Sequence, residues 1–201
     1  MIADIHAALE GLKLRKMREI VETELKAAQA KKTSYSAFLL DLLRQEVEDK
    51  RRRSVEGRIR QAMLPDRWTL ETFPFHLQPC VSKKQHQEFA ELDFIAQAEN
   101  IVWMGGTGVG KTGLASSILL KALYAGRTGR VVKAQDLFDE FSASLADRST
   151  QGLLKRLSRV DVLLIDELGY VEPKPGQINN FFRLVENRYG KKPTLITTNL
   201  G

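Results

Sequence analysis

The feature that most constrains the fold is an eight-residue run, 105–112, that fits the phosphate-binding pattern G-x-x-x-x-G-K-[ST]. The run reads Gly105-Gly106-Thr107-Gly108-Val109-Gly110-Lys111-Thr112. The four residues before it, 101–104, are apolar and partly β-branched, which predicts a buried strand. Residues 112–125 are mostly good helix formers and end at Gly126, which predicts a helix. A strand, a glycine-rich loop and a helix in this order predict a loop that holds nucleotide phosphates.

The residue types in this loop suit phosphate binding for physical reasons. Glycines allow positive φ, so successive amide groups can point inward around an anion, and the positive end of the helix adds to the attraction. We expect Lys111 to reach the β- and γ-phosphates and Thr112 to place its hydroxyl on Mg²⁺. The alternative is a glycine-rich turn before a helix, which average composition would produce in roughly one chain in a hundred.

Strands and helices alternate through the second half of the chain. The strands are predicted at 101–104, 130–134, 160–166 and 194–198, and the later helices at 135–145, 150–157 and 177–189. This alternation predicts a three-layer α/β/α domain around a parallel sheet.

Composition divides the chain into three parts. Residues 1–64 contain no proline and place apolar residues at helical spacing, which predicts a helical segment. The basic cluster and the family resemblance described below suggest that this segment binds DNA or a partner. Residues 65–81 carry three prolines among apolar anchors and form an extended connector. Residues 82–201 form the nucleotide-binding core.

Several local features are expected within the first two parts and at the start of the core. Thr33 or Ser34 caps a helix that ends at Pro65 and carries an apolar face. The members of this face are Leu39, Leu42, Leu43 and Val47. Phe73 and Phe75 either wall the adenine of a nucleotide or dock the connector onto the core. A single helix over 83–98 would bury Phe89, Leu92, Ile95 and Ala96.

Two acids follow the most apolar strand. Asp166 and Glu167 end the run Val162-Leu163-Leu164-Ile165, which is a Walker B pattern. In parallel sheets, ligands bind at the carboxyl ends of the strands, where Asp166 would hold Mg²⁺ and Glu167 would deprotonate the attacking water. The alternative is a solvated turn. Asn199, after the strand 194–198, either occupies the sensor 1 position that places this water or is a strand-end turn residue.

The chain resembles the IstB type of transposition helper ATPase, an AAA+ family related to the DnaC-type helicase loaders. The resemblance is carried by residues 98–112, by 162–170, by Asn187-Arg188-Tyr189 and by Thr197-Thr198-Asn199-Leu200. It spans the whole chain, including the connector at 70–73. It implies an ATPase that uses ATP and Mg²⁺, binds DNA largely without sequence preference, assembles into homo-oligomers and delivers target DNA to the transposase of the same element.

Two departures from the family pattern stand out. Gly106 occupies a position that is usually proline, which should only loosen the loop. The chain ends at Gly201, whereas an AAA+ core continues with a strand and a helical lid that carry sensor 2 and an arginine finger, so we expect a truncated core. Arg188 is considered as a residue that acts across a subunit interface.

Composition narrows the remaining possibilities. The net charge is +6. Cys80 is the single cysteine, so no internal disulfide can form, which predicts a reducing, cytoplasmic location. No apolar stretch approaches the ~20 residues of a membrane span. The three histidines lack metal-ligand spacing, so Mg²⁺ is the one metal implied.

A basic cluster in the first part suggests DNA binding. It consists of Lys50, Arg51, Arg52, Arg53, Arg58 and Arg60. On a helix these side chains could follow a phosphate backbone, or they could form a solvated face paired with nearby acids such as Glu46 and Asp49.

Two alternatives to the transposition ATPase remain at this point. One is a loader of a replicative helicase, since the core alone does not identify the partner. The other is an ATP- or DNA-binding fragment without catalytic activity.

Overall fold

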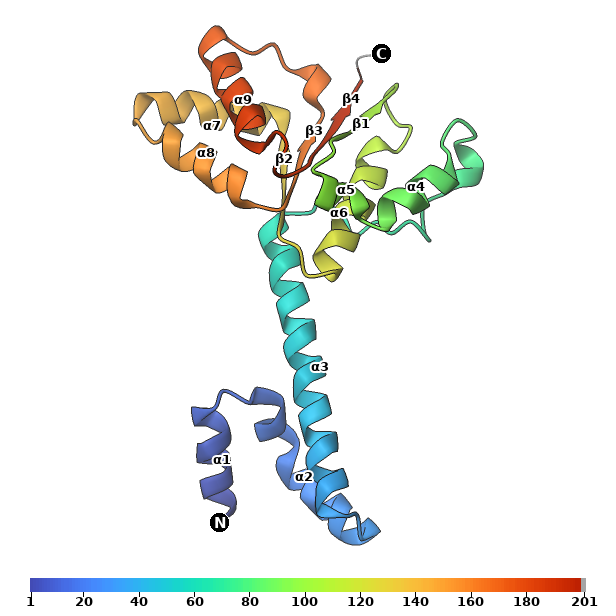
Figure 1. The fold of residues 1–201 in the computed structure, drawn as a ribbon, viewed down its shortest axis with the longest axis vertical. Helices are drawn as coiled ribbons and strands as arrows, with labels where there is room; N and C mark the ends of the chain where they lie inside the picture. Colours follow the sequence, from blue (N-terminus) through green and yellow to red (C-terminus); the bar gives the residue numbers. More distant parts are fainter. Residues whose placement is uncertain (200–201) are drawn as a thin grey trace. The chain divides into compact units, whose positions relative to one another are not determined.

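The computed structural model describes residues 1–199 and separates into two compact units, Met1–Glu56 and a second unit that begins at Gly57 (Figure 1). One helix, α3 (Tyr35–Ala62), crosses this boundary. The first unit otherwise contains α1 (Ile2–Gly11) and α2 (Arg15–Lys31). The chain is therefore helical up to Ala62, and α3 ends before Pro65, with Met63 in a left-handed conformation.

The first unit is held together by a small apolar core and one buried carboxylate. Leu9, Met17, Val21 and Leu42 form the core. Helix α2 has no side-chain cap of its own, and its Met17 amide donates to the buried Glu46 carboxylate at 2.9 Å. Glu46 thereby ties α2 to α3.

The apolar face expected on this helix is mostly uncovered. Leu42 is buried, but Leu39, Leu43 and Val47 are 52%, 43% and 65% exposed, so only one of the four side chains on this face contributes to the core of the first unit. The expected cap is confirmed at Ser34, whose hydroxyl accepts from the Ala37 amide at 3.3 Å.

The second unit is built on a four-stranded parallel sheet with the order β1-β4-β3-β2. The strands are β1 (Ile101–Met104), β2 (Gly129–Lys133), β3 (Val162–Asp166) and β4 (Thr194–Thr198). The helices between them are α6 (Lys111–Tyr124), α7 (Ala134–Ala146), α8 (Thr150–Arg159), the 3₁₀ turn η2 (Leu168–Tyr170) and α9 (Pro175–Arg188). The predicted parallel α/β fold is confirmed.

Side chains alternate across β3 and so reach two separate apolar layers. Val162 and Leu164 face a cluster that includes α6, whereas Leu163 and Ile165 face a cluster with α7, α8 and α9. The sheet therefore lies between two helical layers, as expected for a three-layer domain (Figure 1). All five β3 side chains are buried, which fixes the end of this strand in place.

The segment ahead of β1 differs from the single helix expected over 83–98. It forms the 3₁₀ turn η1 (Phe75–Leu77), then α4 (Lys83–Ala90) and the short α5 (Asp93–Gln97). Leu92 adopts φ 69° and breaks the helix. The buried residues are His86 and Phe94, and Ala96 is exposed. His86 is buried because its Nε2 accepts from the Trp103 indole at 2.9 Å and its Nδ1 lies 2.9 Å from the Ser82 carbonyl oxygen.

Within residues 1–199, no helix combines the length and the apolar character that crossing a bilayer requires.

Candidate active site

The glycine-rich loop joins the end of β1 to the start of α6. Gly108 and Gly110 have φ of 81° and 87°, values that side chains rarely allow, and α6 begins directly at Lys111. The Lys111 ammonium donates to the Gly105 and Gly106 carbonyl oxygens at 2.8 and 2.7 Å. The loop is thus curled with its lysine folded across it, so a bound anion would have to draw the ammonium away from these carbonyls.

The connector packs against this loop. A Cβ built on Gly110 would lie 2.7 Å from the Phe73 ring, and one on Gly113 would lie 3.6 Å from Trp68. Phe73 is buried and meets Phe75 edge to face, with ring centroids 4.8 Å apart. Of the two roles considered for Phe73, the structure therefore favours docking onto the core.

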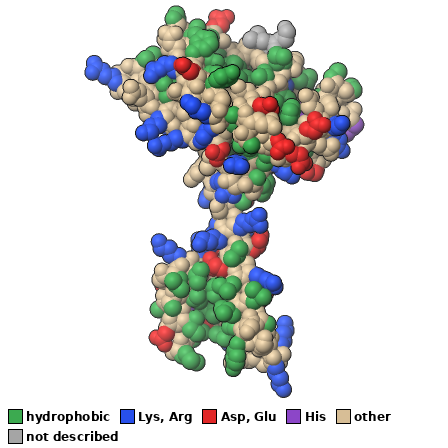
Figure 2. Space-filling model, in the orientation of Figure 1, with side chains coloured by type: hydrophobic (Ala, Val, Ile, Leu, Met, Phe, Trp, Pro, Cys, Tyr) green, Lys and Arg blue, Asp and Glu red, His purple; other side chains and the backbone are tan. Residues whose placement is uncertain are grey.

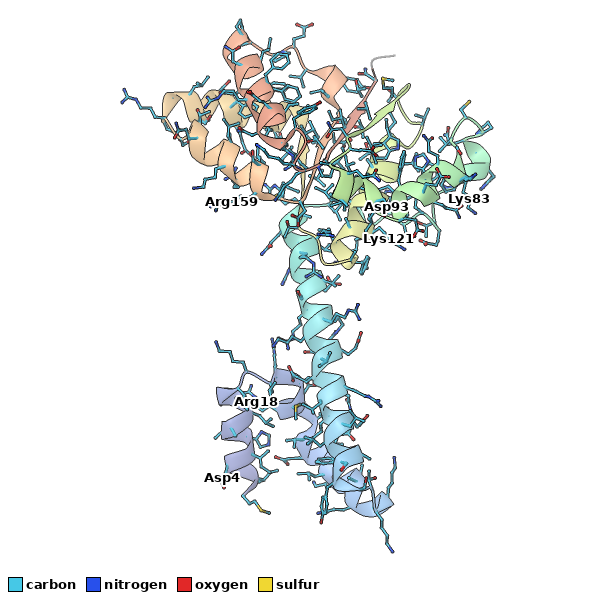
Figure 3. All side chains as sticks on the ribbon, viewed as in Figure 1. Asp4, Arg18, Lys83, Asp93, Lys121 and Arg159 are labelled. Carbon is cyan, nitrogen blue, oxygen red and sulfur yellow. The ribbon has the colours of Figure 1, made fainter. Side chains whose placement is uncertain are left out.

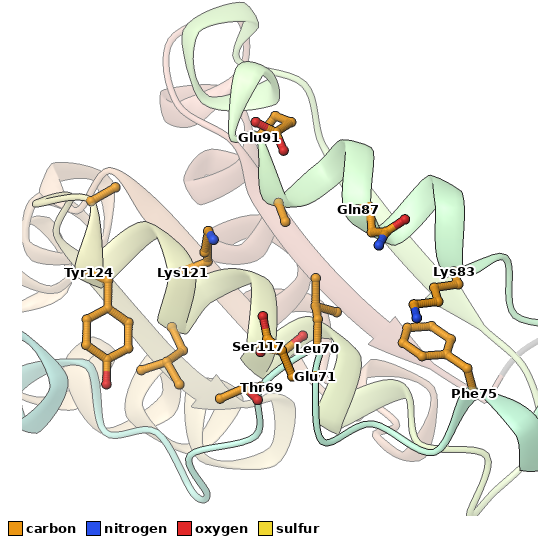
Figure 4. Close-up of a pocket in the computed structure, with 13 residues that line it drawn as sticks. Thr69, Leu70, Glu71, Phe75, Lys83, Gln87, Glu91, Ser117, Lys121 and Tyr124 are labelled. Carbon is orange, nitrogen blue, oxygen red and sulfur yellow. The ribbon is translucent and has the colours of Figure 1, made fainter.

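Phe75 lines a cavity of about 870 Å³ between the connector, α4 and α6. Figure 4 shows Lys121 and Tyr124 of α6 on one side of this cavity and Phe75 and Lys83 on the other. The adenine role of Phe75 stays a prediction.

Asp166 connects the loop to the sheet. Its Oδ1 accepts from the Thr112 hydroxyl at 2.9 Å and also from the Thr197 hydroxyl. The carboxylate is buried at the carboxyl end of β3, while Thr112 lies in the first turn of α6 and Thr197 near the end of β4. Residues 54 positions apart in the chain, Thr112 and Asp166, are thereby brought together, as the sequence predicted.

Glu167 follows Asp166 in a constrained backbone conformation. Its φ of 62° and ψ of 39° place a non-glycine residue in the left-handed region, which costs about 1–3 kcal/mol and tends to occur at functional sites. The Glu167 amide donates to the Thr197 hydroxyl at 2.9 Å. Its carboxylate is half-exposed and lies 3.9 Å from the Lys133 ammonium at the end of β2. The carboxylate is therefore directed out of the sheet, where it can reach solvent.

Asn199 directly follows β4, the strand between β1 and β3. This strand is linked to the phosphate loop because the Gly105 amide donates to the Thr198 carbonyl oxygen at 3.3 Å. Within residues 1–199, the buried Asn199 Oδ1 has no hydrogen-bond partner. An unpaired buried oxygen at the same sheet edge as Asp166 and Glu167 is suited to a water or ligand group.

Sequence reasoning did not single out Thr197, Lys133 or Tyr170. The Thr197 hydroxyl donates to the Asp166 carboxylate and accepts from the Glu167 backbone amide, and Lys133 is the ion-pair partner of the Glu167 carboxylate. The Tyr170 hydroxyl lies 2.5 Å from the Thr107 hydroxyl, which links η2 to the glycine loop. The signal available for Thr197 was its position next to the end of a strand, but its neighbours depend on the strand order.

The proposed role of Arg188 across a subunit interface is wrong. The side chain is 1% exposed, and its guanidinium donates to the carbonyl oxygens of Leu157, Val160 and Pro193 and to the Thr194 hydroxyl. Burial lowers the pKa of Arg188 to about 10, which leaves it charged at neutral pH. Arg188 therefore joins α9 to the loops before β3 and β4 inside one subunit.

The basic cluster expected to bind DNA is partly paired with acids, as the alternative reading required. Arg52 and Arg53 donate to Asp49 at 2.5 and 2.6 Å, and these hydrogen bonds lower the pKa of the Asp49 carboxyl. Lys50 and Arg51 are exposed in the first unit, without an ion pair among the described residues.

The two remaining members of the cluster, Arg58 and Arg60, lie in the second unit. The Arg58 Nε donates to the Leu123 carbonyl oxygen at 2.9 Å, and Arg60 is exposed. The structure therefore divides the cluster between two units.

The site offers hard oxygen donors to a metal. A group of three or more His, Cys, Asp or Glu residues suited to a metal does not occur in the part of the chain that the structure describes. The Thr112 hydroxyl and the Asp166 carboxylate, 2.9 Å apart beside the glycine loop, are the donor types that Mg²⁺ prefers when phosphates supply its other ligands. These residues therefore fit a magnesium–nucleotide complex.

Comparisons with known proteins agree with this geometry. The profile of the family described as "IstB-like ATP binding protein" matches residues 7–201. The chain is 34% identical to an ATP-binding protein of insertion sequence IS21 from Pseudomonas aeruginosa, over 98% of the chain and 75% of the relative. It is 33% identical to its counterpart in IS5376 of Geobacillus stearothermophilus, over 97% and 78%.

Two solved structures resemble part of this chain. AMPPCP-bound DnaA from Aquifex aeolicus matches with a TM-score of 0.59 and 22% identity, over 68% of this chain and 43% of DnaA. The DnaC helicase loader matches with a TM-score of 0.54 and 25% identity, over 59% of this chain and 68% of the loader. The fold is thus that of AAA+ P-loop domains.

Proposed function

Because the chain belongs to the IstB-like ATP-binding protein family, we propose that it hydrolyses ATP and binds DNA to assist the transposase of an insertion element. The observation that carries the catalytic part is the hydrogen bond from Thr112, at the end of the glycine loop, to Asp166, which Glu167 follows directly in the chain. Each of these side chains is of the type that phosphoryl transfer from ATP to water requires.

The roles follow from the positions of the groups. The backbone amides of 106–112 and the Lys111 ammonium would hold the phosphates. Thr112 and Asp166 hold Mg²⁺, which neutralises charge on the phosphates when it is bound. The Glu167 carboxylate accepts a proton from the attacking water, and the Asn199 amide orients that water.

The proposal that this chain assists a transposase is supported by the names of its relatives. Those from Pseudomonas aeruginosa and Geobacillus stearothermophilus are named as insertion-sequence proteins that bind ATP. We propose a homo-oligomer that engages DNA through its phosphates, with Lys50, Arg51 and Arg60 among the contacts, and delivers it to the transposase of the same element.

A second candidate is a loader of a replicative helicase. The similarity of part of this chain to the DnaC helicase loader favours it. The two candidates share an ATPase core and differ in the partner, so co-purification with a transposase of the same element and with a replicative helicase distinguishes them. Retention of the helicase alone would overturn the transposition proposal.

The catalytic part is tested with two variants of the whole chain in the presence of DNA. Lys111→Ala should lose binding of a fluorescent ATP analogue, because the main phosphate cation is removed. Glu167→Gln should still bind the ATP analogue, but its rate of phosphate release should fall by about 100-fold or more, the usual range for the loss of a general base. Normal hydrolysis by Glu167→Gln would refute the general-base role. Absence of hydrolysis in the unmodified chain would favour the non-catalytic binding fragment.

A further inference from the structure

Four arginines surround one cavity at the edge of the sheet opposite to Asp166 and Glu167. The cavity has a volume of about 510 Å³ and is formed by the end of α3, the start of β2 and the end of α8. The arginines are Arg58, Arg130, Arg156 and Arg159. Among the described residues that line it there is no carboxylate and no aromatic ring.

A second, shallower cavity continues this surface across α8. It has a volume of about 340 Å³ and is lined in part by Lys155, Arg159 and Arg183. Arg159 lines both cavities, and Ser158, which lines the second, has a buried hydroxyl without a partner in the described part of the chain. Figure 2 shows Lys and Arg side chains gathered on the side of the second unit where Figure 1 places α8. We call the cationic side chains of both cavities the α8 basic surface.

Two acids next to α8 are already engaged, one of them by a cation of this surface. Glu140 pairs with Arg156 at 2.7 Å. Asp161 accepts from the Thr128 amide and hydroxyl, both at 2.8 Å, and lies 3.4 Å from the Lys192 ammonium. In contrast, the exposed Arg159 guanidinium has no hydrogen bond or ion pair within residues 1–199, and Figure 3 shows it at the end of α8. The surface therefore keeps a positive excess.

Two of these cations have local structural partners: the Arg58 Nε donates to the Leu123 carbonyl oxygen at 2.9 Å, and Arg130 donates to the Gln61 carbonyl oxygen at 3.3 Å. Arg156 and Arg159 lie in the last turn of α8, where cations complement the helix dipole. That explanation does not extend to Arg58, which comes from α3, or to Arg130, which comes from β2. Three separate elements contribute cations to one concave surface, which favours a shared anionic ligand.

The composition of the surface identifies the ligand as the phosphate backbone of duplex DNA. Guanidinium groups bind phosphate oxygens with paired hydrogen bonds. Single-stranded nucleic acids are usually held by stacking of bases on aromatic rings, and both cavities lack such rings among their described lining residues. Contacts to phosphates alone carry no base information, so binding should be insensitive to sequence.

We propose that the α8 basic surface is the main DNA-binding surface of the second unit, which deepens the proposed function and rests on its DNA-binding part. β3 runs from Val162 at this edge to Asp166 at the nucleotide site, about 13 Å away at the usual rise of a strand. DNA and nucleotide can therefore be bound at the same time at opposite edges of one sheet.

The test compares variants of the full chain by fluorescence anisotropy with a labelled duplex of mixed sequence, across a series of salt concentrations. Arg130→Gln/Arg159→Gln should weaken binding at least tenfold and reduce the slope of log K against log salt by about 2, close to one per lost phosphate contact. The control Lys84→Gln removes one charge on α4, away from this surface and from the cavity that Phe75 lines, and is compared with Arg159→Gln; it should bind as the unmodified chain does. All three variants should keep binding of a fluorescent ATP analogue, which reports that the unit is folded.

The other outcomes separate the two proposals. If the double variant binds DNA as tightly as the control, the location is wrong, while DNA binding itself stands. If the unmodified chain does not bind duplex DNA although it binds the ATP analogue, the DNA-binding part of the proposed function fails as well. Equal competition by polyglutamate at matched charge would instead identify an acidic protein as the ligand and overturn the proposal. Arg159→Gln alone removes no contact within residues 1–199, so it keeps the test available if the double variant does not fold.

Discussion

Replacement of Arg188 tests whether this arginine stabilises the subunit or acts in catalysis. In Arg188→Ala, the carbonyl oxygens of Leu157 and Val160 lose the donor that Arg188 supplies, and the Pro193 carbonyl oxygen keeps only the Leu163 amide, at 3.5 Å. A hydrogen bond from a charged donor contributes about 1.5–3 kcal/mol, and because the individual losses do not add, the loss of several such bonds amounts to about 3–5 kcal/mol in total. We therefore expect Arg188→Ala to lower the free energy of unfolding by about 3–5 kcal/mol.

The assay is thermal unfolding followed by circular dichroism. For a chain of this size, 1 kcal/mol lowers the melting temperature by about 2–4 °C, so Arg188→Ala should melt roughly 10–15 °C below the unmodified chain. Arg188→Lys keeps a charge but replaces the planar fork of donors by one ammonium, so it should restore only part of the loss.

An arginine that acts across a subunit interface would behave differently. Its removal would leave the melting temperature within about 2 °C of the unmodified chain and would abolish hydrolysis only in the assembled oligomer. That result would refute the assignment of Arg188 to the interior. It would also mean that the contacts from α9 to the loops before β3 and β4 contribute little to stability.

The sequence allowed the nucleotide loop and the Walker B acids to be predicted because each is a local pattern with a fixed partner element. A glycine loop between a strand and a helix determines where Thr112 lies, and an apolar strand ending in Asp166 determines where that acid lies. Since parallel strands end at one edge of a sheet, the two could be expected to meet before the strand order was known.

Contacts that depend on strand order could not be predicted in this way. Thr197 meets Asp166 and Glu167 only because β4 lies between β1 and β3. Arg188 is buried because the last turn of α9 faces loops that are distant in the chain. The break at Leu92 has no glycine or proline to mark it.

Two further predictions concern polar contacts at opposite edges of the sheet. Thr197→Val keeps the side-chain shape but removes the hydroxyl that donates to Asp166 and accepts from the Glu167 amide. ATP binding should therefore stay within about threefold of the unmodified chain, while hydrolysis falls about 10–100-fold. Thr197→Ser should restore hydrolysis, and unchanged hydrolysis by the valine variant would exclude this positioning role. The second prediction concerns pH. Burial alone would raise the pKa of Asp161, but hydrogen bonds from Thr128 and the nearby Lys192 ammonium together outweigh it and hold that pKa below its ordinary value of about 3.9. A carboxyl whose pKa is lower in the folded than in the unfolded chain stabilises the fold above the unfolded pKa, and this stabilisation is lost as the pH falls through the folded pKa. Asp161→Asn can still accept from Thr128 but cannot ionise, so its deficit in unfolding free energy, measured by urea denaturation, should be present at pH 6 and shrink toward pH 3. A deficit that stays constant over this range would show that the charge of Asp161 does not contribute.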